Sequence, residues 1–271
     1  MNKVFPLVAV MLTSLLLAAC DVIESSPTEA SSPHPTPLAT QTPTAPDTGW
    51  WVAGAGVETR ELDVTQQSRS DRLRIVRVDP NALTLRVRYD PAHPRRVGDW
   101  MRDEAVRLVI NGGFFDRDHR AQGLLIADGA VSGQTYVGMG GLFGVQGGQV
   151  HIRSLILQPY RPGEHFDQMV QSFPMLLVGN GAINDQIRDD GDVAPRSVVG
   201  LDRSGRIEFL VSPLATFSLT GLAAWLAQSD LDLDTALNLD GGTSSGLVVR
   251  TGNGLWGTDN WVPVPAVIVA Q

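Results

Sequence analysis

Short apolar stretches joined by tight turns dominate the chain after residue 50. Three pairs of such stretches flank two-residue turns that favour hairpins, at Asp128-Gly129, Gly147-Gly148 and Ser204-Gly205. The apolar residues of a helical bundle would instead recur every three to four positions. Residues 83–89 alternate strictly between apolar and polar side chains, which is typical of a half-buried strand. The pattern therefore predicts a domain built mainly from strands.

Two stretches have the spacing of helices, residues 97–107 and residues 219–231. In the first, Trp100 and Met101 are expected to point toward the core. We therefore predict one domain over residues 50–271 of the α+β class. It is expected to be β-rich, with a mixed sheet and two or three helices.

Two further expectations concern the order of the strands. Residues 73–78 and residues 83–89 are predicted to be neighbours, because only a short turn separates them. Residues 262–270 are predicted to form the last strand. Pro263 and Pro265 place that strand at the edge of a sheet, since proline cannot donate to a ladder.

The first twenty residues resemble a bacterial lipoprotein signal peptide. A basic start and an apolar run end at Leu17-Ala18-Ala19-Cys20, and Cys20 is the single cysteine of the chain. The run is shorter than the roughly 20 residues that a membrane-spanning helix needs. We predict that residues 1–19 are removed, that Cys20 carries lipid, and that the protein is extracytoplasmic and anchored to a membrane as a lipoprotein. The alternatives are an uncleaved membrane span and a secreted protein with a free thiol.

Residues 20–49 are predicted to form a tether between this anchor and the folded domain. Between Glu24 and Thr48 the chain has six prolines and ten serines or threonines, a composition that does not offset the entropy cost of ordering. The net charge is −8, from 21 basic and 29 acidic residues, which argues against nucleic-acid binding through clustered cations. We expect no nucleic-acid partner, and we expect the protein to contact a membrane through the lipid anchor alone.

Two predicted strands end in the same pattern of a polar residue and two glycines. Asn111-Gly112-Gly113 follows residues 108–110, and Asp240-Gly241-Gly242 follows residues 236–239. Paired glycines permit positive φ and let backbone N–H groups approach an anion closely. The two turns are candidates for anion-binding sites. Two ordinary turns capped by Asn and Asp side chains are the alternative.

A serine-hydrolase site fits the chain poorly. Residues 242–246 satisfy the G-x-S-x-G pattern, but that motif needs a helix after the turn, and residues 247–249 are typical of a strand. The last histidine is His165, which precedes the serine. Only a rearranged triad that uses His151 or His165 stays open.

We expect no metal ion and no cofactor. A single cysteine excludes cysteine-rich metal sites, and no two histidines of the domain have the spacing of a ligand pair. The acidic loop 185–192 fails the calcium-loop pattern, because aligning Gly191 places Gln186 and Arg188 at ligand positions. A surface Ca²⁺ site is the open alternative, without support.

Four motifs together resemble the phosphodiester glycosidase domain family. They are the turn at Asn111, residues 171–176, residues 196–200 and the turn at Asp240, and the resemblance spans about residues 105 to 270. It implies hydrolysis of the bond between the anomeric carbon of a sugar and a phosphate, with the motifs around one pocket. The expected partner is a glycan or sugar-phosphate substrate. The alternative is a non-catalytic glycan- or phosphate-binding lipoprotein on the same fold.

The residues of these motifs suit that reaction. The departing phosphate needs a cation and N–H donors but little protonation, because the second pKa of a phosphate monoester is about 6. We predict Arg196 as the phosphate cation, Asp240 as base or nucleophile, and Asn111 as the residue that orients sugar or phosphate. Arg196 would also suit an exposed strand start. The predicted substrate-binding residues are Gly112, Gly113, Asp116, Ser172, Gly241, Gly242 and Ser244.

Some of these residues also have a purely structural interpretation. Asp116, the second candidate carboxylate, would suit an Asx turn, and Ser172 would suit a buried structural position. Phe114, Phe115 and Phe173 are expected in the core rather than as a platform for a sugar ring.

The lipid anchor depends on one atom, the Cys20 sulfur. Intact mass spectrometry of protein from the membrane fraction should give a chain that begins at Cys20 and carries added acyl groups. Cys20→Ser should lose the acyl mass, and the control Ser25→Ala should keep it. An unmodified chain that begins before Cys20 would contradict the prediction.

Overall fold

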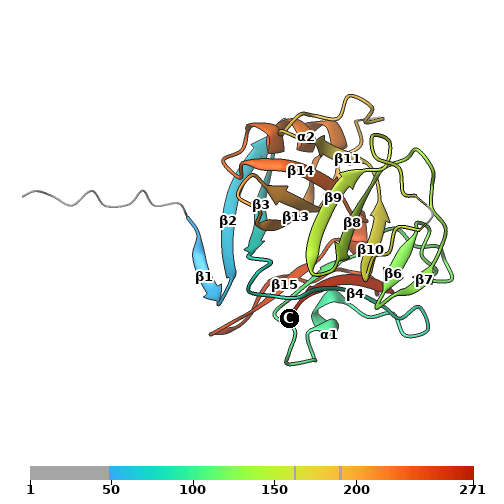
Figure 1. Cartoon of the computed structure of the whole chain (residues 1–271). Coiled ribbons are helices and arrows are strands. Elements are labelled where there is room, and N and C mark those ends of the chain that lie inside the picture. The colour runs from blue at the N-terminus through green and yellow to red at the C-terminus, as the bar shows by residue number, and fades with distance from the viewer. Residues whose placement is uncertain (1–48, 162, 189–190) are drawn as a thin grey trace, which may run out of the picture. The chain divides into compact units, whose positions relative to one another are not determined.

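The computed structural model describes residues 49–271, apart from residue 162 and residues 189–190. The predicted signal peptide, Cys20 and the predicted tether up to residue 48 lie outside the described residues. The described part folds into three sheets and two α-helices, which confirms the predicted β-rich α+β class (Figure 1).

The largest sheet has seven strands. In spatial order they are β1 (Trp51–Gly54), β2 (Val57–Gln66), β3 (Arg69–Val78), β13 (Ile207–Phe217), β12 (Ala194–Asp202), β14 (Leu233–Asn238) and β11 (Met175–Val178). Helix α2 (Leu219–Gln228) carries the chain from β13 to β14, which both pair with β12 between them.

Two five-stranded sheets complete the fold. One has the order β7 (Ala130–Ser132), β6 (Leu125–Ala127), β10 (Gln168–Ser172), β8 (Gly141–Gln146) and β9 (Gln149–Ser154). The other has the order β16 (Gly254–Thr258), β15 (Leu247–Thr251), β5 (Leu108–Asn111), β17 (Ala266–Ala270) and β4 (Leu85–Tyr89). The short helix α1 (Val97–Trp100) connects β4 to β5.

The predicted mixed sheet is wrong, because every ladder among the described strands is antiparallel. Parallel neighbours need a long crossover connection. Each helical connection here joins two strands that have a third strand between them. Strand β12 lies between the two strands that α2 connects, and β17 lies between the two strands that α1 connects. The inserted strand runs antiparallel to both.

Both expectations about strand order are also wrong. The strands over residues 73–78 and 83–89 follow one another in the chain but belong to different sheets, since β3 pairs with β2 and β13 while β4 pairs with β17. Strand β17 begins after Pro265 and lies between β4 and β5 rather than at an edge. The prolines precede the strand, so its ladder keeps all its N–H donors.

The three predicted hairpins are confirmed as β6–β7, β8–β9 and β12–β13. Asp128 and Gly129 both have positive φ, 48° and 78°, which is the turn geometry that matches strand twist. The first predicted helix shortens to α1, and Trp100 and Met101 are buried as predicted.

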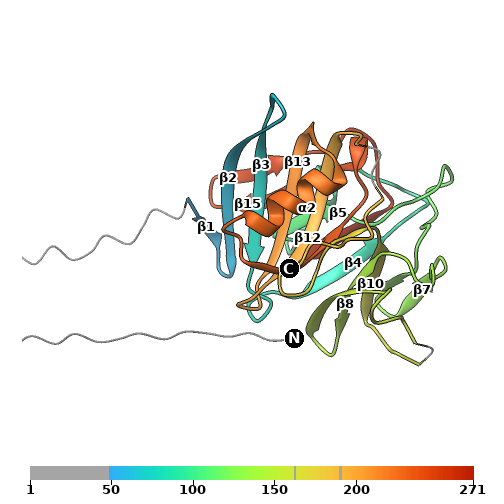
Figure 2. The same cartoon turned by 90° about the horizontal axis from the view of Figure 1, so that it is seen from above.

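The main core lies between the three sheets. Phe143 of β8, Phe209 of β13 and Ile268 of β17 are fully buried in one apolar cluster. The next residue along β13, Leu210, faces the other way and packs with Leu222 of α2. Helix α2 therefore covers the outer face of the seven-stranded sheet (Figure 2).

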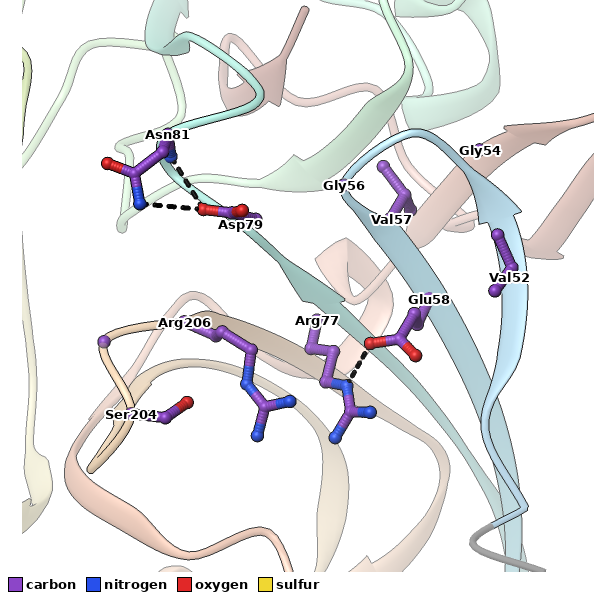
Figure 3. Close-up of a pocket in the computed structure, with 11 residues that line it drawn as sticks. Val52, Gly54, Gly56, Val57, Glu58, Arg77, Asp79, Asn81, Ser204 and Arg206 are labelled. Atoms are coloured by element: carbon purple, nitrogen blue, oxygen red, sulfur yellow. Dashed lines mark hydrogen bonds and ion pairs between the residues drawn. The ribbon is translucent and has the colours of Figure 1, made fainter. Parts of the chain in front are cut away.

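One of the carboxyl groups buried in the seven-stranded sheet has no hydrogen-bond partner among the described residues. Glu208 of β13 is 3% exposed, and neither of its carboxyl oxygens has a hydrogen-bond partner among the described residues. Burial, with the charge of Asp202, raises the pKa of Glu208 to about 8, against the opposing charges of Arg77 and Arg206. These two arginines line a cavity of about 500 Å³, where Arg77 donates to Glu58 at 2.5 Å (Figure 3).

The raised pKa of Glu208 makes the stability of the fold depend on pH. The folded chain holds a proton that the unfolded chain releases near pH 4.5, so stability is lost as pH rises from about 4.5 to about 8. Glu208→Gln keeps the neutral shape and removes this dependence. By urea unfolding, it should exceed the wild type in stability by up to about 4 kcal/mol at about pH 8.5 and match it near pH 4.5. Equal pH dependence in both proteins would contradict the assignment.

Candidate active site

Asn111 joins the end of one sheet to the end of another. It is the fully buried last residue of β5, and its Nδ2 donates to the Asp240 carbonyl oxygen at 2.7 Å. Its Oδ1 accepts from the Ser197 hydroxyl at 2.7 Å and from the Gly246 N–H at 3.1 Å. The Asp240 N–H donates to the Gly112 carbonyl oxygen at 3.1 Å. These bonds bring the two glycine turns together. They also occupy the Asn111 side chain, so it is a positioning residue rather than the predicted substrate contact.

Asp240 lies where the two turns meet. Its side chain is half-buried, and its Oδ1 accepts from the Gly241 N–H at 2.9 Å. Burial raises the pKa of Asp240 to about 6, while hydrogen bonds from the Ser244 hydroxyl and the Gly241 N–H oppose the rise. A carboxyl group that titrates close to neutral pH can both hold and release a proton during a reaction.

Arg196 of β12 lies beside the second turn. Its Nε donates to the Phe217 carbonyl oxygen at 3.2 Å, and its Nη2 donates to the Asp192 carbonyl oxygen at 2.9 Å. A Cβ built on Gly241 would lie 3.9 Å from Arg196 Nη1, so the guanidinium is close to that glycine. The predicted cation and the predicted carboxylate are thus next to the same residue, Gly241.

Close packing explains three of the four glycines in the turns. A Cβ at Gly112, Gly113 or Gly241 would lie within 3.0 Å of a neighbouring carbonyl oxygen. Of the four, Gly242 alone has positive φ, at 59°. The backbones therefore approach one another closely, as expected, but the left-handed conformation is confined to one residue.

Two of the predicted N–H donors are already used within the protein. The Gly112 N–H donates to the Ala266 carbonyl oxygen at 2.9 Å, and the Gly241 N–H donates to the Asp240 side chain. In this structure neither N–H group is directed toward a ligand. Gly113 and Gly242 are the backbone donors that keep this role as candidates.

An aromatic pair follows the first turn. The rings of Phe114 and Phe173 stack with centroids 4.3 Å apart, and Tyr136 meets Phe173 edge-on at 6.5 Å. Phe114, Phe115 and Phe173 are all partly buried, so none of them belongs to the fully buried core. Phe115 packs against the edge of a small core cluster. Partly exposed aromatic faces of this kind can stack on a sugar ring.

Asn238, which the sequence did not single out as a site residue, links this aromatic pair to the carboxylate. Its Nδ2 donates to the Phe173 carbonyl oxygen at 2.9 Å, and its N–H donates to the Pro174 carbonyl oxygen at 3.0 Å. Asp240 follows two residues later, so Phe173 is held near it. A signal was present, because Asn238 and Asn111 both lie at the ends of apolar strands.

Ser244 lies in the short 3₁₀ turn η1 (Gly242–Ser244), where its hydroxyl contacts Asp240. Strand β15 follows this turn, where a nucleophile elbow would have a helix. The serine-hydrolase interpretation therefore lacks its structural context.

Asp116 and Ser172 lie in the surroundings that a purely structural role would give them. Asp116 Oδ1 accepts from the N–H groups of Asp118 and Arg120, each at 2.9 Å, which is an Asx turn. The same residue lines a cavity of about 750 Å³ that Tyr136 shares. Ser172 is fully buried at the end of β10, and its hydroxyl has no hydrogen-bond partner among the described residues.

Within residues 49–271, less the three residues not described, no group of three or more His, Cys, Asp or Glu side chains is placed to hold a metal ion. The acidic loop 185–192 is described only in part. No helix in the described part of the chain is both long enough and apolar enough to cross a membrane.

Residues 104–270, more than half of the chain, match the family model described as phosphodiester glycosidase. The chain belongs to the phosphodiester glycosidase family. This confirms the resemblance carried by the four motifs. The hydrogen bonds that join Asn111, Ser197 and Asp240 all lie inside the matched region.

The proteins that are similar to this chain include a curated bacterial relative and several solved structures. The uncharacterized protein YigE of Escherichia coli is 30% identical over 161 residues, which span 56% of this chain and 61% of YigE, under two thirds of its length. The catalytic domain of zebrafish N-acetylglucosamine-1-phosphodiester alpha-N-acetylglucosaminidase, auto-inhibited by its pro-peptide, matches with a TM-score of 0.64 and 20% identity over 79% of this chain and 83% of that chain.

A hypothetical protein from Synechocystis matches with a TM-score of 0.53 and 18% identity, over 80% of this chain and 62% of that chain. A putative exported protein from Burkholderia pseudomallei matches with a TM-score of 0.54 and 10% identity, over 74% of each chain. At these identities the structural likeness establishes the shared fold.

Two fully buried serines test the hydrogen bonds around Asn111. Ser197 donates to Asn111 Oδ1, whereas Ser172 has no partner in the described part of the chain. Ser197→Ala should lower the free energy of unfolding by about 1–2 kcal/mol, because it also leaves a buried acceptor short of a donor. Ser172→Ala is the matched control and should change stability by less than about 0.5 kcal/mol. Equal losses in urea unfolding would contradict a special role for Ser197.

Proposed function

We propose that this protein hydrolyses the glycosidic bond between a sugar anomeric carbon and a phosphate in an extracytoplasmic sugar-1-phosphodiester. The observation that carries the proposal is the carboxyl group of Asp240, with its pKa raised to about 6, next to the glycine that Arg196 approaches. Family membership and the fold shared with the zebrafish catalytic domain support the reaction class. The predicted lipid on Cys20 would hold the enzyme at a membrane.

Arg196 is proposed to bind the phosphate. A guanidinium presents two parallel donors to phosphate oxygens, and the carbonyl oxygens of Phe217 and Asp192 set its orientation. The bond between the anomeric carbon and the phosphate oxygen breaks with its electron pair moving to that oxygen. The developing phosphate charge is stabilised by Arg196 and by the candidate N–H groups of Gly113 and Gly242.

Asp240 is proposed to act at the sugar side of the same bond. Its ionised carboxylate stabilises the positive charge that develops on the anomeric carbon. As a base it takes a proton from the attacking water, and the configuration at that carbon inverts. As a nucleophile it forms a covalent glycosyl ester that water then hydrolyses, and the configuration is retained. The configuration of the released sugar distinguishes the two roles.

The exposed aromatic pair gives the sugar a surface on which to stack. Phe114 directly follows Gly113, and the carbonyl oxygen of Phe173 accepts a hydrogen bond from Asn238. We propose that a sugar ring placed there directs its anomeric carbon toward Asp240, which follows Asn238 by two residues. This arrangement assigns the sugar to the aromatic side and the phosphate to the Arg196 side.

Asp240→Asn separates an enzyme from a binding protein. The substitution keeps the size of the side chain and removes its charge, so hydrolysis of a sugar-1-phosphodiester panel should fall by about a thousandfold or more. Asp116→Asn removes the alternative carboxylate and should keep turnover within about threefold. Unchanged turnover in Asp240→Asn would overturn the assignment. Absence of turnover with every diester, together with retained sugar-phosphate binding, would favour the non-catalytic lipoprotein.

A further inference from the structure

A cavity of about 820 Å³ adjoins the candidate active site. Its volume is within the range of pockets that take organic ligands. Phe173 and Pro174, whose carbonyl oxygens accept from Asn238, form part of its wall. Leu219, the first residue of α2, forms another part, two residues after the carbonyl group that orients Arg196. The cavity is therefore bounded by segments whose backbone carbonyl groups bind side chains of the candidate site.

The wall of this cavity is largely apolar. Its apolar side chains include Met139, Ile156, Phe173, Met175, Ile187 and Leu219. The segment that contains Met139 also exposes Val137, which is 85% exposed, so apolar surface continues outward from the cavity.

The polar residues of the wall come from one loop. They are Asn184, Asp185, Gln186 and Arg188. The Asn184 side chain is used within the protein, since its Nδ2 donates to the Met175 carbonyl oxygen at 2.9 Å and its Oδ1 accepts from the Gln186 N–H at 3.1 Å. Asp185, Gln186 and Arg188 also line the cavity and are exposed to solvent.

We propose that this cavity binds a hydrocarbon chain esterified to the phosphate, so that the preferred substrate is a sugar-1-phosphate diester of an apolar alcohol. The inference rests on the proposed function, which puts the phosphate at Arg196. The cavity, which Phe173 and Leu219 bound, would then receive the group esterified to that phosphate. A sugar or another polyhydroxylated group would leave hydroxyls facing Ile156, Ile187 and Leu219 without partners.

The test compares two simple phosphate monoesters that share the charge and differ in the chain. n-Butyl phosphate and methyl phosphate are titrated by calorimetry into the full-length protein. Each methylene buried in an apolar wall raises affinity by about fourfold, so butyl phosphate should bind at least about tenfold more tightly. Equal affinities, or no binding of either ester, would overturn the inference.

Neighbouring residues supply the matched variants. Ile156 lines this cavity, whereas Leu157 is 64% exposed and lines a different one. Ile156→Ser should bring the ratio of butyl to methyl affinity below about threefold, and Leu157→Ser should leave it unchanged. Ile187→Ser, in the exposed loop, should also lower the ratio and replaces Ile156→Ser if that variant does not fold. A ratio that survives both cavity variants would overturn the inference.

The proposed function is tested separately by turnover. If butyl phosphate binds preferentially but no diester of any alcohol is hydrolysed, the cavity assignment stands and the hydrolase assignment falls. If methyl and butyl diesters are hydrolysed with equal kcat/KM and their monoesters bind equally, the hydrolase assignment stands and the cavity assignment falls.

Discussion

The hydrogen bonds of Asn111 are the constraint on which the site depends. Apolar contacts hold the three sheets together, but such contacts have no direction and do not set where two strand ends meet. The bonds from Asn111 to Asp240 and from Ser197 to Asn111 are directional and buried. A displaced strand end would leave those groups without partners at a cost of about 1–3 kcal/mol each. One amide side chain thus fixes the candidate carboxylate of one sheet against the glycine turn of another.

Burial has different consequences at two acids of this fold. It raises the pKa of both Glu208, to about 8, and Asp240, to about 6. Glu208 is almost completely enclosed between strands, where a proton reaches no substrate, and it only makes stability depend on pH. Asp240 is half-buried in a turn, accepts from Gly241, and lies close to the glycine that Arg196 approaches. The same desolvation therefore sets a stability property in one place and suits chemistry in the other.

Local features of this fold could be predicted from sequence, and non-local ones could not. The turns at Asp128-Gly129 and Gly147-Gly148 follow from the φ preferences of two residues, and the β12–β13 hairpin has positive φ at Gly205 alone. The neighbours of β3, β4 and β17 are set by pairing between segments distant in the sequence. The alternation of apolar and polar residues predicts a strand but not the strand it pairs with. Pro265 predicted an edge strand, whereas it is the residue just before β17, which lies in the interior of its sheet.

The candidate site was predicted in the same uneven way. The motifs indicated the family, and the structure places Asp240 and Arg196 near one turn. The paired glycines were expected to permit positive φ, whereas a Cβ at Gly112, Gly113 or Gly241 would meet a neighbouring carbonyl oxygen that only the tertiary structure brings close. The aromatic side chain of Phe173 did not by itself indicate that this residue is partly exposed. Its partner Asn238 contacts the Phe173 backbone carbonyl oxygen, and the type of side chain at position 173 does not predict that contact.

The central claim is that ionised Asp240 is the active form of this site. The pH dependence of kcat/KM for a sugar-1-phosphodiester tests it most directly, because that ratio reports the ionisation of the free enzyme. The phosphodiester keeps a single charge across this range, so the substrate adds no titration. We expect kcat/KM to rise about tenfold per pH unit below an apparent pKa near 6 and to level off above it. A profile that is flat between about pH 4.5 and 7.5, or that falls as pH rises through 6, would contradict the account.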